Sequence, residues 1–359
     1  MLNLNIDTFV YLPLFLIVAY GALTEPLDPY KPNRRLQNFA LVIFVLLSGL
    51  RFVGDTPGYA IYYQTNIDSP FEIGYVFISN FFRTLHFNFP LFLLSVTAIT
   101  GLLIKKAFAN QWFFFAMLMI LGKLATFYAF SGLRQWIALC ICFYAVSILL
   151  KGKRLYFLLI VIIAVQFHRS AIIIAPMALF YKREFRYKVA LITICIAIVI
   201  GMNPLQFLQS ASDVNPLLDG RGYLTQEGNE VAMGGINAFN WVENFAILIP
   251  AVFFRKKIHE RVPNYDFFLY MHLIYCCFLI GGSEFGIIKR LRDYYVTGYY
   301  VLLPAFMYLF PQKQRRFYLL IVVLYFGLLF FRSLNFYWQV GQYQSVFSHP
   351  EAWDMIWGK

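Results

Sequence analysis

Ionisable side chains are scarce in the apolar segments of this chain, and most of those present are arginines. Arg134 follows Ser131 and Gly132 where an apolar segment begins, which places it in the first turn of a predicted helix. The helix dipole already makes that position positive, so a cation there is unfavourable unless an anion accompanies it. The sequence therefore predicts that Arg134 binds an anion. The alternative is an arginine that extends to the membrane surface.

Two residues are candidates for a general base. His168 stands beside Arg169, and a neighbouring cation favours the neutral imidazole that a base requires. Asp55 lies between Gly54 and Gly58 in a segment that can turn sharply, and its carboxylate could orient an arginine or act on a hydroxyl group. The alternatives are a packed histidine and a solvated carboxylate in an ordinary turn.

The elements that must position these residues are apolar helices. Of the 359 residues, 60% are hydrophobic and 13% are charged, whereas soluble domains have about 45–50% apolar and about 25% charged residues. A soluble fold of this length could not bury so much apolar surface, and a β-barrel would need alternating polar residues. We therefore expect an all-α, polytopic integral membrane protein that forms a single domain over residues 1–359.

Apolar segments follow one another along the chain, and about twelve are near the length that a membrane crossing needs. They lie at about 8–24, 36–53, 89–105, 111–130, 133–150, 155–168, 169–181, 189–205, 240–254, 265–283, 294–310 and 317–334. The segment 71–87 is only partly apolar, and we expect a re-entrant or interfacial helix there.

The connections between these segments alternate in charge. By the positive-inside rule the Lys- and Arg-rich connections are cytoplasmic, so loops 54–88 and 203–239 and both termini are predicted to be extracytoplasmic. The net charge of +12 then reflects orientation towards anionic membrane lipid, and nucleic acid is not an expected partner.

Residues 155–181 lie between two basic connections, so the chain must cross an even number of times there. About 27 residues make about 40 Å of helix, which is too short for two crossings. We therefore expect a short broken hairpin with His168 near its tip, bordering a cavity on the outer side.

Lys289, Arg290 and Arg292 are cations on the predicted outer side, against the general trend. Guanidinium groups match phosphate oxygens in pairs, so these residues are candidates for binding a phosphate. The alternative is a set of salt bridges to Glu284 and Asp293.

Several common functional motifs are absent from the sequence. There is no Walker A motif, dinucleotide glycine fingerprint, HExxH or GxSxG motif, and the cysteines lack the spacing of a metal site. We expect no metal and no cofactor, so an already activated, lipid-linked compound would have to supply the energy of the reaction.

The chain resembles the EpsG family, relatives of the Wzy-type polysaccharide polymerases. The pieces that carry the resemblance occur in order over nearly the whole chain: Gly49-Leu50-Arg51 with Gly54, Asp55 and Tyr59; Glu72-x-Gly74-Tyr75; Arg134; Phe167-His168-x-Ser170-Ala171; and Arg290 and Arg292 before Tyr294-Tyr295.

The resemblance implies a metal-independent, GT-C-like glycosyltransferase in the bacterial inner (cytoplasmic) membrane. It would join undecaprenyl-pyrophosphate-linked oligosaccharide repeat units at the outer face, with the growing chain as donor and the incoming unit as acceptor. The product would be O-antigen, capsule or exopolysaccharide. A chain-length regulator and a flippase are expected partners.

This reaction assigns roles to the candidate residues. Arginines would stabilise the departing pyrophosphate, and aromatic rings would contact sugar faces. The catalytic candidates are His168, Asp55 and Arg134; the pyrophosphate-binding candidates are Arg290, Arg292, Arg51 and Arg169; and the sugar-binding candidates are Tyr59, Tyr75, Tyr223, Tyr294 and Tyr295.

Two other functions remain open. A flippase or transporter of lipid-linked oligosaccharide should carry charge along its whole path and often has two related halves. Here the buried charges gather on the predicted outer side and no internal repeat is visible, which favours a one-sided enzyme. An O-antigen-type ligase shares nearly all of the polymerase chemistry.

Overall fold

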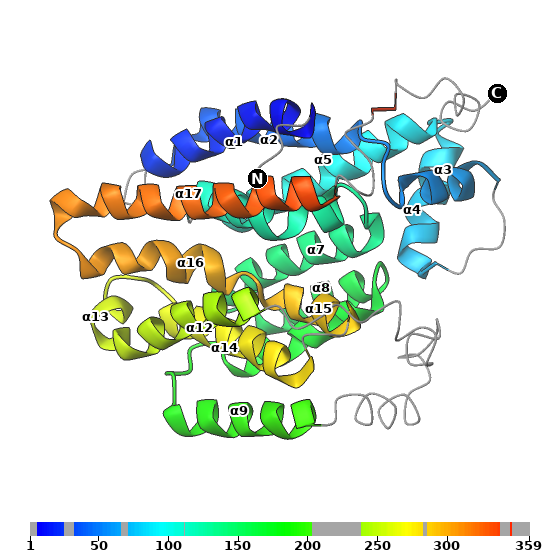
Figure 1. The fold of residues 1–359 in the computed structure, drawn as a ribbon. Coiled ribbons are helices and arrows are strands. Elements are labelled where there is room, and N and C mark those ends of the chain that lie inside the picture. The colour runs from blue at the N-terminus through cyan, green and yellow to red at the C-terminus, as the bar shows by residue number, and fades with distance from the viewer. Residues whose placement is uncertain are drawn as a thin grey trace. The chain divides into compact units, whose positions relative to one another are not determined.

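The computed structural model describes residues 6–24, 32–65, 71–110, 112–202, 238–282, 286–337 and 345–346. The chain forms two compact units: residues 1–178 with 310–359, and residues 179–309. Across these described ranges the named elements are all helices, as predicted, and an isolated antiparallel bridge joins Arg51 to Ser345 (Figure 1).

Within the described ranges, four helices are long and apolar enough, by length and composition, to cross a membrane. They are α5 (Phe89–Phe108), α7 (Leu133–Leu150), α14 (Tyr265–Gly282) and residues Gln312–Leu334 of α17 (Gln312–Tyr337). Shorter apolar helices of 10–17 residues accompany them. The all-helical membrane class is thereby supported, and the larger number of crossings stays a prediction.

The first unit is built by successive helix pairs. Five further helices belong to this unit: α1 (Ile6–Thr24), α2 (Arg34–Gly49), α6 (Phe113–Met119), the π-helix η1 (Ile120–Ala129) and α8 (Arg154–Val165). α1 packs against α2, α6 and α17, while α2, α5, α7 and α8 pack in that order (Figure 1). Gly101 lets α2 and α5 approach closely, because an added Cβ would lie 2.8 Å from Leu41 and Val45 side-chain atoms.

At one end of this unit, the start of α2 is hydrogen-bonded to the end of α5, and both places carry Lys or Arg residues. Arg34 Nη1 and Gln37 Nε2 donate to the Ala109 carbonyl oxygen at 2.9 Å and 3.2 Å. The start of α2 and the end of α5 therefore lie together, as expected if residues 31–35 and 105–106 share one side of the membrane.

The predicted outer loop 54–88 contains two helices. They are α3 (Thr56–Thr65) and α4 (Ile73–Thr84), and the second lies within the segment 71–87, where a re-entrant or interfacial helix is expected. The Tyr63 hydroxyl donates to the Phe87 carbonyl oxygen at 2.9 Å, which holds α3 beside the start of α5.

The segment 155–181, where a short broken hairpin is expected, is interrupted near His168. α8 ends at Val165, and the chain resumes as the 3₁₀-helix η2 (Arg169–Leu179). Pro176 lacks an N–H group and disfavours a regular α-helix, which explains the 3₁₀ conformation. The helix α8 is about 18 Å long and η2 is about 22 Å long. Each is shorter than the bilayer core of about 30 Å.

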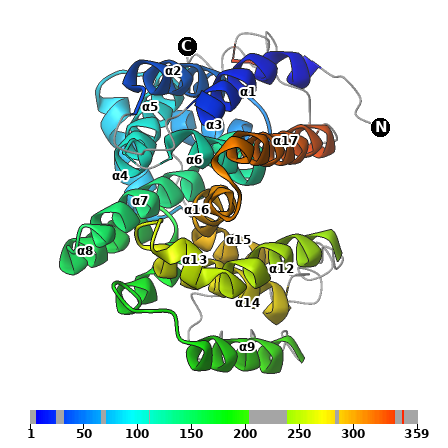
Figure 2. The ribbon, with the colours of Figure 1, turned by 90° about the vertical axis from the view of Figure 1, so that its left-hand side faces the viewer.

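The second unit surrounds α14. Its other elements are α9 (Tyr187–Met202), α12 (Ala238–Phe253), α13 (Arg255–His259), α15 (Gly286–Arg292), η4 (Asp293–Tyr295), α16 (Gly298–Ala305) and η5 (Phe306–Leu309). α9, α12 and α16 all pack against α14 (Figure 2). The predicted loop 203–239 lies outside the described residues except at its last two positions.

Candidate functional site

Arg134, in the first turn of α7, contacts residues of α3 and of the segment that leads into α4. Its guanidinium forms an ion pair with the carboxylate of Glu72, which immediately precedes α4. Arg134 Nε donates to the hydroxyl of Tyr59 on α3 at 3.4 Å, and the Phe71 ring centroid lies 4.4 Å from Arg134 Cζ. The Arg134 side chain is 8% exposed and that of Glu72 is 15% exposed. This is a nearly buried charge pair at a helix N-terminus.

The Glu72 carboxylate explains how the fold tolerates this cation. A guanidinium in the first turn of a helix meets the positive end of the dipole, and a carboxylate beside it offsets the cost. The sequence predicted an anionic partner for Arg134 without identifying Glu72. In the structure the chain itself supplies this anion.

Aromatic rings enclose the Arg134–Glu72 pair. Tyr75 packs against Tyr59 and Phe71 with ring centroids 5.4 Å and 5.3 Å apart, and Tyr62 lies 4.9 Å from Phe71. Tyr75 is fully buried and Tyr59 is 6% exposed, whereas Phe71 is only half-buried. Burial raises the pKa of the Tyr59 hydroxyl above its usual value, so Tyr59 stays protonated beside Arg134.

The turn that carries Asp55 is fastened to the segment before Arg134. The Asp55 backbone N–H donates to Ser131 Oγ at 3.2 Å, while Asp55 itself is exposed. Gly54 has a φ of +64°, and an added Cβ would lie 2.5 Å from Ser131 Oγ. Only glycine fits this turn without strain.

Arg51 is buried between two rings. Its Nη1 donates to the Tyr11 hydroxyl at 2.7 Å, and its Cζ lies 4.8 Å from the Phe130 ring centroid. The preceding carbonyl, that of Leu50, accepts from the Val346 N–H at 2.9 Å. Arg51 therefore links α1, the segment after the π-helix and the chain near residue 346.

His168 belongs to a segment that touches the start of α4. The Gly74 N–H donates to the Gln166 carbonyl oxygen at 2.8 Å, two residues after Glu72 and two before His168. His168 is half-buried, and its Nδ1 lies 2.5 Å from Ser170 Oγ, whereas Arg169 is exposed. The first unit thus brings Arg51, Asp55, Tyr59, Tyr75, Arg134 and the His168 segment into one connected network.

The remaining candidates lie in the second unit. Arg292 is buried, with its Cζ 4.7 Å from the Tyr275 ring centroid and its Nε 3.4 Å from Asp293 Oδ1. This contact is part of the salt-bridge alternative considered from the sequence. Arg290 is half-buried, and Tyr294 and Tyr295 are 1% and 2% exposed. Tyr223 lies outside the described residues.

A family model matches residues 34–345, which include most of both units. The chain belongs to the EpsG family. This match confirms the resemblance found in the sequence, and the family's relation to Wzy-like polysaccharide polymerases supports a polysaccharide polymerase-type function in general. A search of curated proteins and a search of solved structures each found no match.

Sequence reasoning about this EpsG-family chain missed two sets of residues. Glu72 enters the sequence analysis only as part of the Glu72-x-Gly74-Tyr75 motif, and its position next to the aromatic Phe71 was the available signal. Asn244 and Tyr299 form a buried hydrogen bond, and His272 Nε2 lies 3.1 Å from the Asn244 carbonyl oxygen. His272 is a packed histidine.

The candidate site in this EpsG-family chain is an arginine–carboxylate pair lined by aromatic rings. Over the described ranges, no group of three or more His, Cys, Asp and Glu side chains is placed to hold a metal ion. The Arg134 guanidinium can exchange a carboxylate for a phosphate, since both present paired oxygens to it.

Proposed function

We propose that this EpsG-family protein joins undecaprenyl-pyrophosphate-linked oligosaccharide repeat units at the outer face of the cytoplasmic membrane. The observation that carries the proposal is Arg134, a nearly buried guanidinium that pairs with an exchangeable carboxylate inside an aromatic shell. The basic connections would lie on the cytoplasmic side, and a flippase and a chain-length regulator would act with the protein.

The proposed reaction transfers the growing glycan to a hydroxyl of the incoming unit. The acceptor oxygen forms a bond to the anomeric carbon of the donor, and the bond from that carbon to the pyrophosphate oxygen breaks. The electron pair leaves with lipid pyrophosphate, and the hydroxyl proton passes to a base. No metal is required if fixed cations stabilise the pyrophosphate.

Arg134 would supply that stabilisation. Charge grows on the pyrophosphate oxygens as the bond breaks, and a donor already fixed in a site of low dielectric stabilises it without reorganisation. In this proposal the pyrophosphate displaces the Glu72 carboxylate from part of the guanidinium. Loss of one such preorganised donor lowers a rate by about 10²–10³-fold.

The base would be His168 or Asp55. The contact between His168 Nδ1 and Ser170 Oγ orients the imidazole ring. Asp55 is exposed at a rigid turn. Both groups belong to the network of the first unit, and the proposal leaves the choice between them to experiment.

The aromatic shell would also contact sugar. Tyr75 is fully buried and packs on neighbouring rings, so it supports the shell rather than presenting an open face. Phe71 is the ring of the shell that is more exposed, and we propose it as the sugar contact in addition to Tyr59.

Complementation of a deletion strain tests the proposal. Arg134→Gln, at wild-type protein level, should leave surface glycan as single repeat units, whereas Arg83→Gln should restore long chains. Arg83 is a suitable control because it also lies in the predicted outer loop and stacks on Tyr62 and Tyr63, with 5.9 Å to each ring centroid. Long chains with Arg134→Gln would refute the clamp. Loss of all transferred glycan in the deletion strain would indicate a ligase or flippase.

A further inference from the structure

The second unit carries a dense group of positive charge at one end of α14. It consists of the connection 182–188 and the segment 255–261, which we call the basic platform. Its exposed cations are Lys182, Arg183, Arg186, Lys188, Lys256, Lys257 and Arg261, whereas its exposed acids are Glu184 and Glu260.

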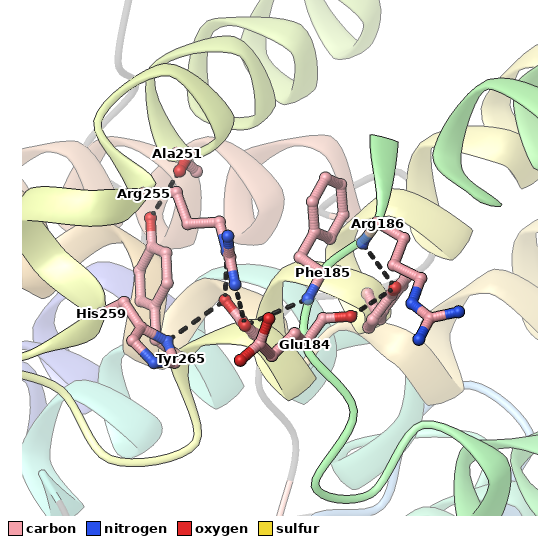
Figure 3. Close-up of polar contacts among 9 residues, drawn as sticks. Glu184, Phe185, Arg186, Ala251, Arg255, His259 and Tyr265 are labelled. Atoms are coloured by element: carbon pink, nitrogen blue, oxygen red, sulfur yellow. Dashed lines mark hydrogen bonds and ion pairs between the residues drawn. The ribbon is translucent and has the colours of Figure 1, made fainter. Parts of the chain in front are cut away.

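Asp266, in the first turn of α14, fastens the two halves of the platform together. Figure 3 labels Phe185, Arg255 and His259, the residues that contact its carboxylate. Its Oδ2 accepts from the Phe185 backbone N–H at 3.0 Å, and Arg255 donates to both carboxylate oxygens at 2.7 Å and 2.5 Å. His259 Nδ1 lies 3.3 Å from Asp266 Oδ1. Asp266 is 4% exposed, so this connection is shielded from water.

Tyr270 makes a second connection one turn further along α14. Its hydroxyl accepts from the Arg186 N–H at 2.8 Å and donates to the Glu184 carbonyl oxygen at 3.0 Å (Figure 3). The backbone that carries the first set of cations is therefore fixed by uncharged hydrogen bonds as well as by Asp266. The cations stand on a rigid support instead of a loose loop.

Exposed apolar side chains adjoin the platform. Tyr187, Leu191 and Ile192 at the start of α9 are 59%, 63% and 60% exposed, and Phe253 at the end of α12 is 78% exposed. Aromatic and apolar side chains next to exposed cations are typical of the boundary between lipid tails and headgroups. A partner for this surface must combine an anionic head with an apolar body.

We propose that the basic platform is a binding site for an anionic phospholipid headgroup. Clusters of four to eight cations beside a membrane-spanning helix attract anionic lipid, with about a fivefold gain in affinity for each cation. The site goes beyond the glycan chemistry of the first unit, because all of its residues belong to the second unit. An acidic protein segment would not need the exposed apolar side chains.

Native mass spectrometry of the purified full-length protein can test this site. The dissociation constants of phosphatidylglycerol and phosphatidylcholine would be measured for the first bound lipid. Arg186→Gln with Lys257→Gln should weaken phosphatidylglycerol binding by about 25-fold, about fivefold for each cation, and leave phosphatidylcholine unchanged. The matched control, Lys105→Gln with Lys106→Gln at the end of α5, should retain wild-type affinity.

Two further variants distinguish binding that depends on the fixed backbone of the platform from binding that depends on net charge alone. Tyr270→Phe keeps every charge, and Asp266→Asn makes the chain more positive, yet both should weaken phosphatidylglycerol binding because they release the 184–186 backbone. Tighter binding by Asp266→Asn with unchanged binding by Tyr270→Phe would overturn the proposal. The proposal would also be overturned if the α5 control lost as much phosphatidylglycerol affinity as the platform variant. Tighter binding of a polyglutamate peptide than of phosphatidylglycerol would overturn it too.

Discussion

The carboxylate of Glu72 pairs with the guanidinium of Arg134 across 62 residues of sequence. Both side chains are largely withdrawn from solvent, and one of them stands where the dipole of α7 is positive. The pair therefore has two consequences that can be measured separately, one for the folded state and one for anion binding.

The first prediction concerns Glu72→Gln. It leaves a nearly buried cation without its carboxylate, so we expect a loss of about 3 kcal/mol in the free energy of unfolding, the lower end for broken buried pairs. The same variant should bind inorganic pyrophosphate more tightly, because the guanidinium no longer has an internal competitor. Thermal unfolding in detergent and calorimetry would measure these effects, with the exposed Glu260→Gln as control. Weaker pyrophosphate binding by Glu72→Gln would contradict the exchange.

The second prediction concerns the turn before α3. Gly54→Ala should destabilise the protein by at least about 1–2 kcal/mol, because alanine disfavours a positive φ and its Cβ would collide with Ser131. Gly58→Ala is the matched control, since its Cβ would meet nothing within 4 Å. Unfolding curves of the two variants should differ clearly, and coincident curves would show that the turn is not constrained.

The third prediction separates the two interpretations of Arg292. If it binds pyrophosphate, Arg292→Gln should abolish long glycan while Asp293→Asn, which retains the cation, should preserve it. If the Arg292–Asp293 ion pair only stabilises the fold, both variants should lose long glycan. Glycan ladders at matched protein level distinguish these results.

The fourth prediction addresses the base. In the proposed reaction either His168 or Asp55 accepts the proton. Substitution of that residue by asparagine should remove the acid limb of the pH–rate profile. The backbone contact of Asp55 with Ser131 survives Asp55→Asn, so that variant should fold normally. Unaltered profiles for both variants would exclude both residues.

The fifth prediction concerns orientation. Gln312→Cys should resist an impermeant thiol reagent applied from outside, whereas Asp55→Cys should react, since both positions are exposed but are predicted on opposite sides. A variant without the native cysteines provides the background. Labelling of position 312 from outside would reverse the assignment of sides.

The sequence located the long helices well. The predicted segments 133–150 and 265–283 agree with α7 and α14 to within one residue, because charged or glycine-rich residues interrupt the apolar runs. It predicted a single segment at 111–130, where the structure has α6 followed by a π-helix. Hydrophobicity alone does not specify which carbonyl each N–H will reach.

The site was predicted only in part. Arg134 was recognisable because a cation at the start of an apolar segment needs an explanation. Its partner Glu72 was not, because an acid in an outer loop is ordinarily solvated and nothing local relates the two positions. Tyr75 was chosen for its ring, but the fold uses that ring to support its neighbours.

The backbones of Gly74 and Gln166 are hydrogen-bonded and too close to admit a side chain at Gly74. An added Cβ on Gly74 would lie 2.7 Å from the Gln166 carbonyl oxygen, so the two backbones are in direct contact. If Glu72 releases Arg134 in the proposed reaction, this contact would connect the displaced segment to the one that carries His168. Leaving-group capture and proton removal would then be cooperative, and substitutions at Glu72 and His168 should not be additive.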